Sequence, residues 1–186
     1  MKNTVSCAVL LLSLLALPAT AKEIAGVNYP ETASVSGQEL KLNGVGLRKK
    51  AIFKVYTVGL YLQTPSQEAA TVISSDQIKR VRMSMKRDLK KEQISEAIVD
   101  GFKKNAGASL GKLQQRLDTF AAAIPDLKEG QELVITYAPG KGTTVTSSSG
   151  QELSVEGKDF ADALFSVWLG KDPVDSGLKN GMLGRE

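Results

Sequence analysis

The most apolar stretch of the chain beyond its first 21 residues runs over 40–62 and predicts a β-hairpin. Its first arm is rich in glycine, with Gly44 and Gly46 two positions apart. Apolar residues of the second arm, 52–62, fall on both faces: Phe53, Val55 and Tyr61 on one, and Ile52, Val58 and Leu60 on the other. This pattern is typical of a strand that is covered on both sides, so we expect a central strand.

Alternation between apolar and basic residues predicts a further strand over 77–87. Its basic face, Arg80, Arg82 and Lys86, is interpreted as a solvated face of the sheet. Apolar positions at helical spacing predict several helices. The remaining expected elements are a helix over 64–74 with Thr64 as cap and Pro65 in its first turn, helices over 89–104 and 109–123 with Ser109 capping the second, strands over 132–138, 143–148 and 152–155, and helices over 159–169 and 173–183. This order predicts one α+β domain, an antiparallel sheet with helices gathered on one face.

The N-terminal 21 residues have the features of a secretory signal peptide. Lys2 precedes an apolar run over 8–17, and the small residues at 19–21 predict cleavage after Ala21. The run is too short to span a membrane, and Cys7 lies too early for a lipoprotein signal. We therefore expect a soluble, exported and periplasmic protein, with a signal peptide over 1–21 and one domain over 22–186.

Composition then excludes several kinds of chemistry. The chain has no histidine, and its only cysteine lies in the predicted signal. A serine–histidine or cysteine–histidine site is therefore impossible, and a zinc site would consist of carboxylates alone. We expect no cofactor. Removal of the signal leaves 23 basic residues against 20 acidic ones, a charge of about +3 that does not call for a nucleic-acid partner.

Arg48 and Tyr56 are the candidate functional residues. Arg48 leads into the most apolar strand, where it is either a solvated turn residue or a ligand for an anion or a polarised oxygen. Tyr56 lies within that strand and needs a partner for its hydroxyl group if it is buried. Trp168 lies among apolar residues of the last long helix, where packing in the core explains it.

Several segments of the chain resemble the chalcone isomerase family. GVGLR at 44–48 and FKVYTVGLYL at 53–62 are similar to the strand pair of chalcone isomerase and its non-catalytic relatives. DFADALFSVWLGKDPVD at 159–175 and LKNGMLG at 178–184 resemble the helix and tail of bacterial chalcone-isomerase-like proteins, and 79–105 and 137–145 fall in the family's order. The resemblance spans 26–184 and implies an open-faced antiparallel β-sheet packed against a layer of helices, with a ligand cleft between them.

The resemblance also suggests roles for individual residues. The family's active-site arginine matches Arg48, and its strand threonine falls at Tyr56. The catalytic tyrosine and asparagine of the plant enzymes fall near Lys90 and Ala97, and the threonine or serine of the last helix falls near Val167, beside Ser166. Plant relatives that bind fatty acids hold the carboxylate with an arginine and a tyrosine, and Arg48 with Tyr56 resembles that pair.

Three functions are consistent with these residues. The first is non-catalytic binding of a fatty acid or similar small apolar anion, in which Arg48 supplies a charged fork for the carboxylate. A second is an isomerase or intramolecular lyase in which Arg48 stabilises an enolate-like oxygen. A third is an interaction protein with a vestigial cleft.

Overall fold

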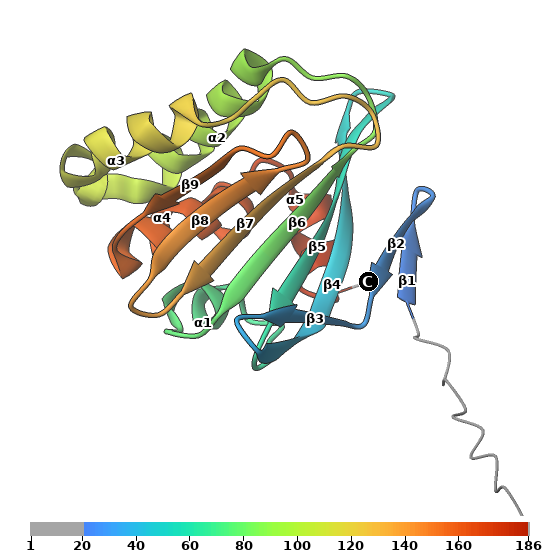
Figure 1. The fold of residues 1–186 in the computed structure, drawn as a ribbon, viewed down its shortest axis with the longest axis horizontal. Coiled ribbons are helices and arrows are strands. Elements are labelled where there is room, and N and C mark those ends of the chain that lie inside the picture. Colours follow the sequence, from blue (N-terminus) through green and yellow to red (C-terminus); the bar gives the residue numbers. More distant parts are fainter. Residues whose placement is uncertain (1–20, 186) are drawn as a thin grey trace, which may run out of the picture.

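The computed structural model describes residues 21–185, in which an antiparallel sheet carries the fold (Figure 1). Seven strands of this part follow one another in the sheet in chain order. They are β3 (Thr32–Val35), β4 (Gln38–Lys50), β5 (Phe53–Leu62), β6 (Lys79–Met85), β7 (Glu132–Ala138), β8 (Gly142–Ser147) and β9 (Glu152–Val155). A separate hairpin consists of β1 (Ala21–Ile24) and β2 (Val27–Pro30).

Helices cover one face of the sheet and enclose the main core between them and the strands (Figure 1). They are α1 (Ala69–Ser74), α2 (Lys91–Ala106), the short 3-10 turn η1 (Gly107–Ser109), α3 (Leu110–Ala122), α4 (Lys158–Leu169) and α5 (Ser176–Met182). The most buried helix is α4, whose Phe160 ring lies 5.6 Å from Phe102 and 5.8 Å from Phe120, measured between ring centroids. The predicted α+β fold is confirmed. No helix within residues 21–185 is long and apolar enough to cross a membrane.

The β1–β2 hairpin partly covers the other face of the sheet, and this changes the role of the basic strand positions. Tyr29 of β2 is fully buried and its hydroxyl group lies 2.7 Å from Thr57 Oγ1. Arg82 packs over the Tyr29 ring and forms an ion pair with Glu132, and Arg80 donates to Thr136 Oγ1. Both arginines are therefore partly buried rather than fully solvated as predicted: Arg82 is covered by β2, which was not foreseen, and Arg80 bonds to β7.

The β4–β5 hairpin begins and ends differently from the prediction. Lys50 pairs with Phe53, so Ala51 and Ile52 form a two-residue turn. Ile52 is 88% exposed and Phe53 is 55% exposed, although the sequence pattern predicted a covered strand from Ile52 onward. From Tyr56 to Leu62 the strand is buried, as expected.

One predicted helix start and one predicted capping bond are wrong. The first helix begins at Ala69 rather than at Thr64, because the backbone nitrogen of Thr64 donates to the Gln77 side chain and that of Ser66 donates to Asn43. These bonds fix an extended connection at the end of the sheet. Ser109 makes no capping hydrogen bond, since it lies in η1, which continues directly from α2 into α3.

The glycines of β4 allow a helix to lie directly on the strand. A Cβ atom added to Gly44 would meet the backbone of α5 and the residues just after it, and one added to Gly46 would lie 2.6 Å from the Leu178 carbonyl oxygen. Helix α5 and the residues before it are thereby held against β4. The approach explains why the first arm of the hairpin is rich in glycine.

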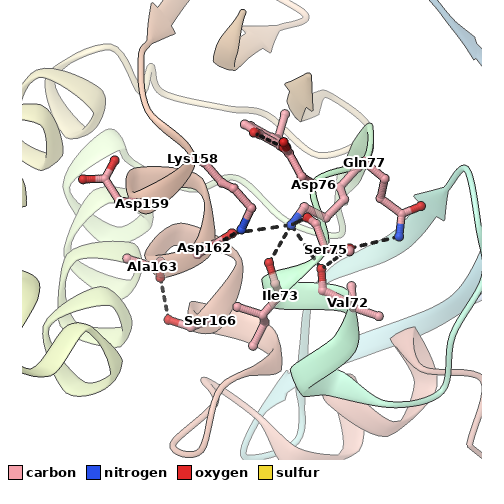
Figure 2. A network of polar contacts seen from close by, with 12 residues as sticks. Val72, Ile73, Ser75, Asp76, Gln77, Lys158, Asp159, Asp162, Ala163 and Ser166 are labelled. Carbon is pink, nitrogen blue, oxygen red and sulfur yellow. Dashed lines mark hydrogen bonds and ion pairs between the residues drawn. The ribbon is translucent and has the colours of Figure 1, made fainter. Parts of the chain in front are cut away.

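A buried lysine satisfies the carbonyl groups at the C-terminal end of α1. The ammonium group of Lys79 donates to the carbonyl oxygens of Val72, Ile73 and Ser75, at 3.1, 2.7 and 3.0 Å. It also lies 3.7 Å from a carboxylate oxygen of Asp162 in α4. Figure 2 shows the carbonyl groups of Val72, Ile73 and Ser75 at the end of α1 and Asp162 of α4 on the other side of this network. Lys79 therefore joins β6, α1 and α4.

Burial lowers the pKa of Lys79 from 10.5 to about 8, against the opposing effect of Asp162. Between these pH values the unfolded chain binds a proton that the native protein lacks, so this residue's contribution to stability rises with pH. Relative to Lys79→Met, wild type should gain about 2 kcal/mol in free energy of unfolding from pH 7.5 to 10. Urea titrations of both proteins measure this difference, and a difference that does not change with pH would contradict it. Burial also raises the pKa of Tyr29 to about 12, and this lowers stability above pH 10. The effect is the same in both proteins, so it cancels in the comparison.

Candidate ligand-binding cavity

A cavity of about 260 Å³ lies between the sheet and the helices, beside β4, β5, β6, α2 and α4. Its wall is mainly apolar and includes Val55, Met83, Met85, Ile94, Ile98 and Val167. Arg48, Tyr56 and Trp168 bring polar groups to it. An apolar cavity with a few polar groups is the usual form of a small-molecule site.

Arg48 lies in β4, three residues before the turn, and lines the cavity. Its Nη1 donates to the carbonyl oxygen of Val174 and lies 3.6 Å from Asp175 Oδ2. These two residues directly precede α5, so the close packing of α5 on β4 fixes the position of the guanidinium group. A guanidinium has five N–H donors, so others remain for a ligand. The interpretation of Arg48 as a solvated turn residue is wrong, because the turn is formed by Ala51 and Ile52.

Tyr56 is the direct cross-strand partner of Arg48 and lines the same cavity. Its side chain is only 8% exposed, and its hydroxyl oxygen accepts a hydrogen bond from Trp168 Nε1 at 3.4 Å. Burial raises the pKa of Tyr56 above its usual 10.0, so the phenol stays neutral near pH 7. Its own O–H proton is available for a ligand, since the bond with Trp168 uses the oxygen as acceptor.

Trp168 therefore does more than fill the core. It is almost fully buried, as expected, but its indole N–H orients Tyr56 and its ring forms part of the cavity wall. The need of a buried indole for a hydrogen-bond acceptor was the signal that could have linked Trp168 to Tyr56. Sequence reasoning also missed Gln93, Lys50 and Arg87 among the lining residues.

The positions that match the catalytic residues of the plant enzymes carry no equivalent groups. Lys90 is exposed, pairs with Asp126 at 2.8 Å and is not among the lining residues. Ala97 and Val167 line the cavity but present only aliphatic side chains. Ser166 lies outside it, and its hydroxyl group donates to the Ala163 carbonyl oxygen. Within residues 21–185, no three acidic side chains come together as a metal site.

Asp175 lies next to the charge that a carboxylate ligand would meet. Its Oδ1 accepts a hydrogen bond from the Leu178 backbone and caps α5, while Oδ2 faces Arg48. Asparagine caps a helix about as well as aspartate but has no charge to repel the ligand. Asp175→Asn should therefore strengthen binding of a fatty acid by about fivefold. Asp172→Asn, the same charge change at an exposed position, is the control, and equal effects of both variants would contradict a local role of Asp175.

The geometry thus describes a sheet-and-helix protein with an apolar cavity and an arginine–tyrosine pair. The family model described as chalcone isomerase-like matches residues 21–184, and the chain belongs to this family. The fold is similar to that of the Arabidopsis thaliana fatty-acid binding protein, with a TM-score of 0.67 at 18% sequence identity, over 88% of this chain and 96% of that one. A search of curated protein sequences finds no match. The resemblance suggested by the sequence is confirmed.

Proposed function

We propose that this protein binds a fatty acid or a similar apolar carboxylate in the cavity and catalyses no reaction. The observation that carries the proposal is the meeting of Arg48 and Tyr56 at one apolar cavity. Hydrogen bonds from an arginine to a carboxylate are charge-assisted, and the neutral Tyr56 hydroxyl group supplies a further donor. The name of the Arabidopsis thaliana protein supports the same class of ligand.

The size of the cavity limits the ligand. At about 260 Å³ it is slightly smaller than the roughly 300–1,000 Å³ that is usual for small-molecule sites. It therefore suits a short acid, or a longer acid whose tail reaches beyond the cavity.

The alternative isomerase function finds less support at the same site. Arg48 could stabilise an enolate-like oxygen, but Lys90 and Ala97 supply no phenol or amide at the positions that match the plant enzymes. Turnover of a chalcone or another enone that disappears in Arg48→Ala would favour an enzyme over a binding protein.

Trp168 gives the proposal a direct test, because it is the only tryptophan of the chain and lines the cavity. Titration with a fatty acid should change its fluorescence in a saturable way. Native mass spectrometry of the same sample should show one bound acid. The absence of both signals for acids of several chain lengths would overturn the proposal and favour an interaction protein with a vestigial cleft.

We further propose that residues 1–21 direct export to the periplasm and are then removed. The apolar run and the small residues before Lys22 support this, and residues 1–20 lie outside those that the structure describes. The protein isolated from the periplasmic fraction should begin at Lys22 by N-terminal sequencing. Recovery of the chain with Met1 from the cytoplasm alone would contradict export.

A further inference from the structure

The tip of the β4–β5 hairpin exposes two large apolar side chains. Ile52 and Phe53 are the only large hydrophobic residues within 21–185 that are exposed. They lie at the far end of two long strands, beside the connections from β6 to α2 and from α3 to β7 (Figure 1). Nothing in the core requires them there, and exposed apolar groups at one place are typical of an interaction site.

The tip is a two-residue turn at the end of two paired strands. Lys50 and Phe53 pair across the turn, and Ala51 adopts a φ angle of 54°, which L-residues rarely occupy. Such a two-residue turn continues the twist of its strands and does not fold back on the sheet. Ile52 is therefore presented at the outermost point of the hairpin.

Positive charge surrounds the tip and exceeds the unpaired negative charge near it. Lys49, Lys50 and Lys54 of the hairpin and Lys86 and Arg87 beside it form no ion pair within residues 21–185, and Arg87 packs over the Phe53 ring at 5.2 Å. The acids of the neighbouring connections include Asp88 and Asp126, which are paired with Lys128 and Lys90 at 2.8 Å, and Glu129, which is not paired within the described part. Five unpaired cations therefore gather at this end, although the net charge of the whole chain is only +4.

We propose that this tip docks on a bilayer surface that carries anionic lipid headgroups. Ile52 and Phe53 enter the interface, and Lys49, Lys50 and Lys54 contact the headgroups. An apolar insertion and a polybasic patch are each weak alone, and together they give stable but reversible attachment. A protein partner of high affinity would need roughly 800 Å² of complementary surface on this chain, which a projecting two-residue turn does not offer.

The cavity is lined in part by residues of the same tip. Lys50, Phe53 and Arg87 contribute both to its lining and to the basic, apolar end of the molecule. An apolar acid could therefore pass between the bilayer and the cavity without crossing bulk water. This step rests on the proposed function, whereas the docking itself does not.

Sedimentation with lipid vesicles tests the docking. The protein should bind phosphatidylcholine vesicles that contain phosphatidylglycerol, bind pure phosphatidylcholine vesicles far more weakly, and dissociate as salt is added. The double variant Lys49→Gln and Lys54→Gln should lose roughly 25-fold in vesicle affinity. Ile52→Ser should lose about tenfold. The control, Lys103→Gln with Lys112→Gln, removes two exposed lysines at the other end of the helical layer and should bind like wild type.

The variants separate docking from ligand binding, because Lys49, Ile52 and Lys54 do not line the cavity. These variants should bind a fatty acid in solution with the same affinity as wild type, measured by titration of Trp168 fluorescence. Equal binding to both kinds of vesicle, no binding to either, or wild-type binding by Ile52→Ser would overturn the docking. Docking without any fatty-acid binding would overturn only the proposed function.

Discussion

Replacing Arg48 with alanine should weaken the binding of a long-chain fatty acid by more than about tenfold. The substitution removes the guanidinium donors that lie opposite Tyr56, and hydrogen bonds to charged groups contribute roughly 1.5–3 kcal/mol. Arg48→Lys should restore the affinity only in part, because an ammonium group lacks the planar fork. Tyr56→Phe removes a neutral hydrogen bond and should cost about fivefold. Titration of Trp168 fluorescence measures all three variants.

The fold should survive these changes, which makes the comparison interpretable. Arg48 is partly exposed and its loss leaves Asp175 as the cap of α5. Circular dichroism and thermal unfolding should therefore resemble those of wild type. Equal affinity of wild type and Arg48→Ala for the acid would show that Arg48 serves only to hold the segment before α5.

Replacing Gly44 with alanine should destabilise the protein by about 3 kcal/mol or more, in the range of severe overpacking. The new methyl group would lie 2.7 Å from the Met182 carbonyl oxygen and from the Gly184 nitrogen, and closer still to the Gly181 carbonyl oxygen. All three are backbone atoms, so no side-chain rotation relieves the contact. The helix would have to move away from β4, which would also displace the support of Arg48.

The control for this variant is Gly111→Ala, at an exposed position of α3 where a Cβ atom meets nothing within 4 Å. Alanine has the higher helix propensity, so this variant should be neutral or more stable by about 0.5–1 kcal/mol. Urea titration gives both free energies of unfolding. A Gly44→Ala protein within about 0.5 kcal/mol of wild type would contradict the close packing of α5.

Elements with a strong period could be predicted from the sequence. The alternation of Val81, Met83 and Met85 with basic residues located β6, and all three apolar side chains face the core. Helix α4 was expected one residue short of its true start. Strands β1, β2 and β3 were missed; each has only four residues and buries at most one of them. Strand β9, of the same length and also with one buried residue, was predicted from the turn residues Ser149 and Gly150 that precede it. Which residue of such a short strand is buried depends on the part of the fold that the strand covers.

The sequence predicted which two residues belong to the candidate site, but not the contacts that hold them in place. Arg48 and Tyr56 were singled out from the predicted hairpin, and the register of its two strands places them directly opposite each other. Val174 and Asp175, which hold Arg48, lie more than 120 residues further along the chain, and only the packing of α5 brings them there. No local pattern encodes such a contact, because it depends on the position of a whole helix.

The most direct test of carboxylate recognition compares a fatty acid with the alcohol of the same chain length in wild type and in Arg48→Ala. Both ligands bury the same tail, so their affinity ratio reports the head group alone. Wild type should bind the acid at least about tenfold more tightly than the alcohol, and Arg48→Ala should bind both about equally. An acid-to-alcohol ratio that is the same in both proteins would contradict the role of Arg48 as the anchor.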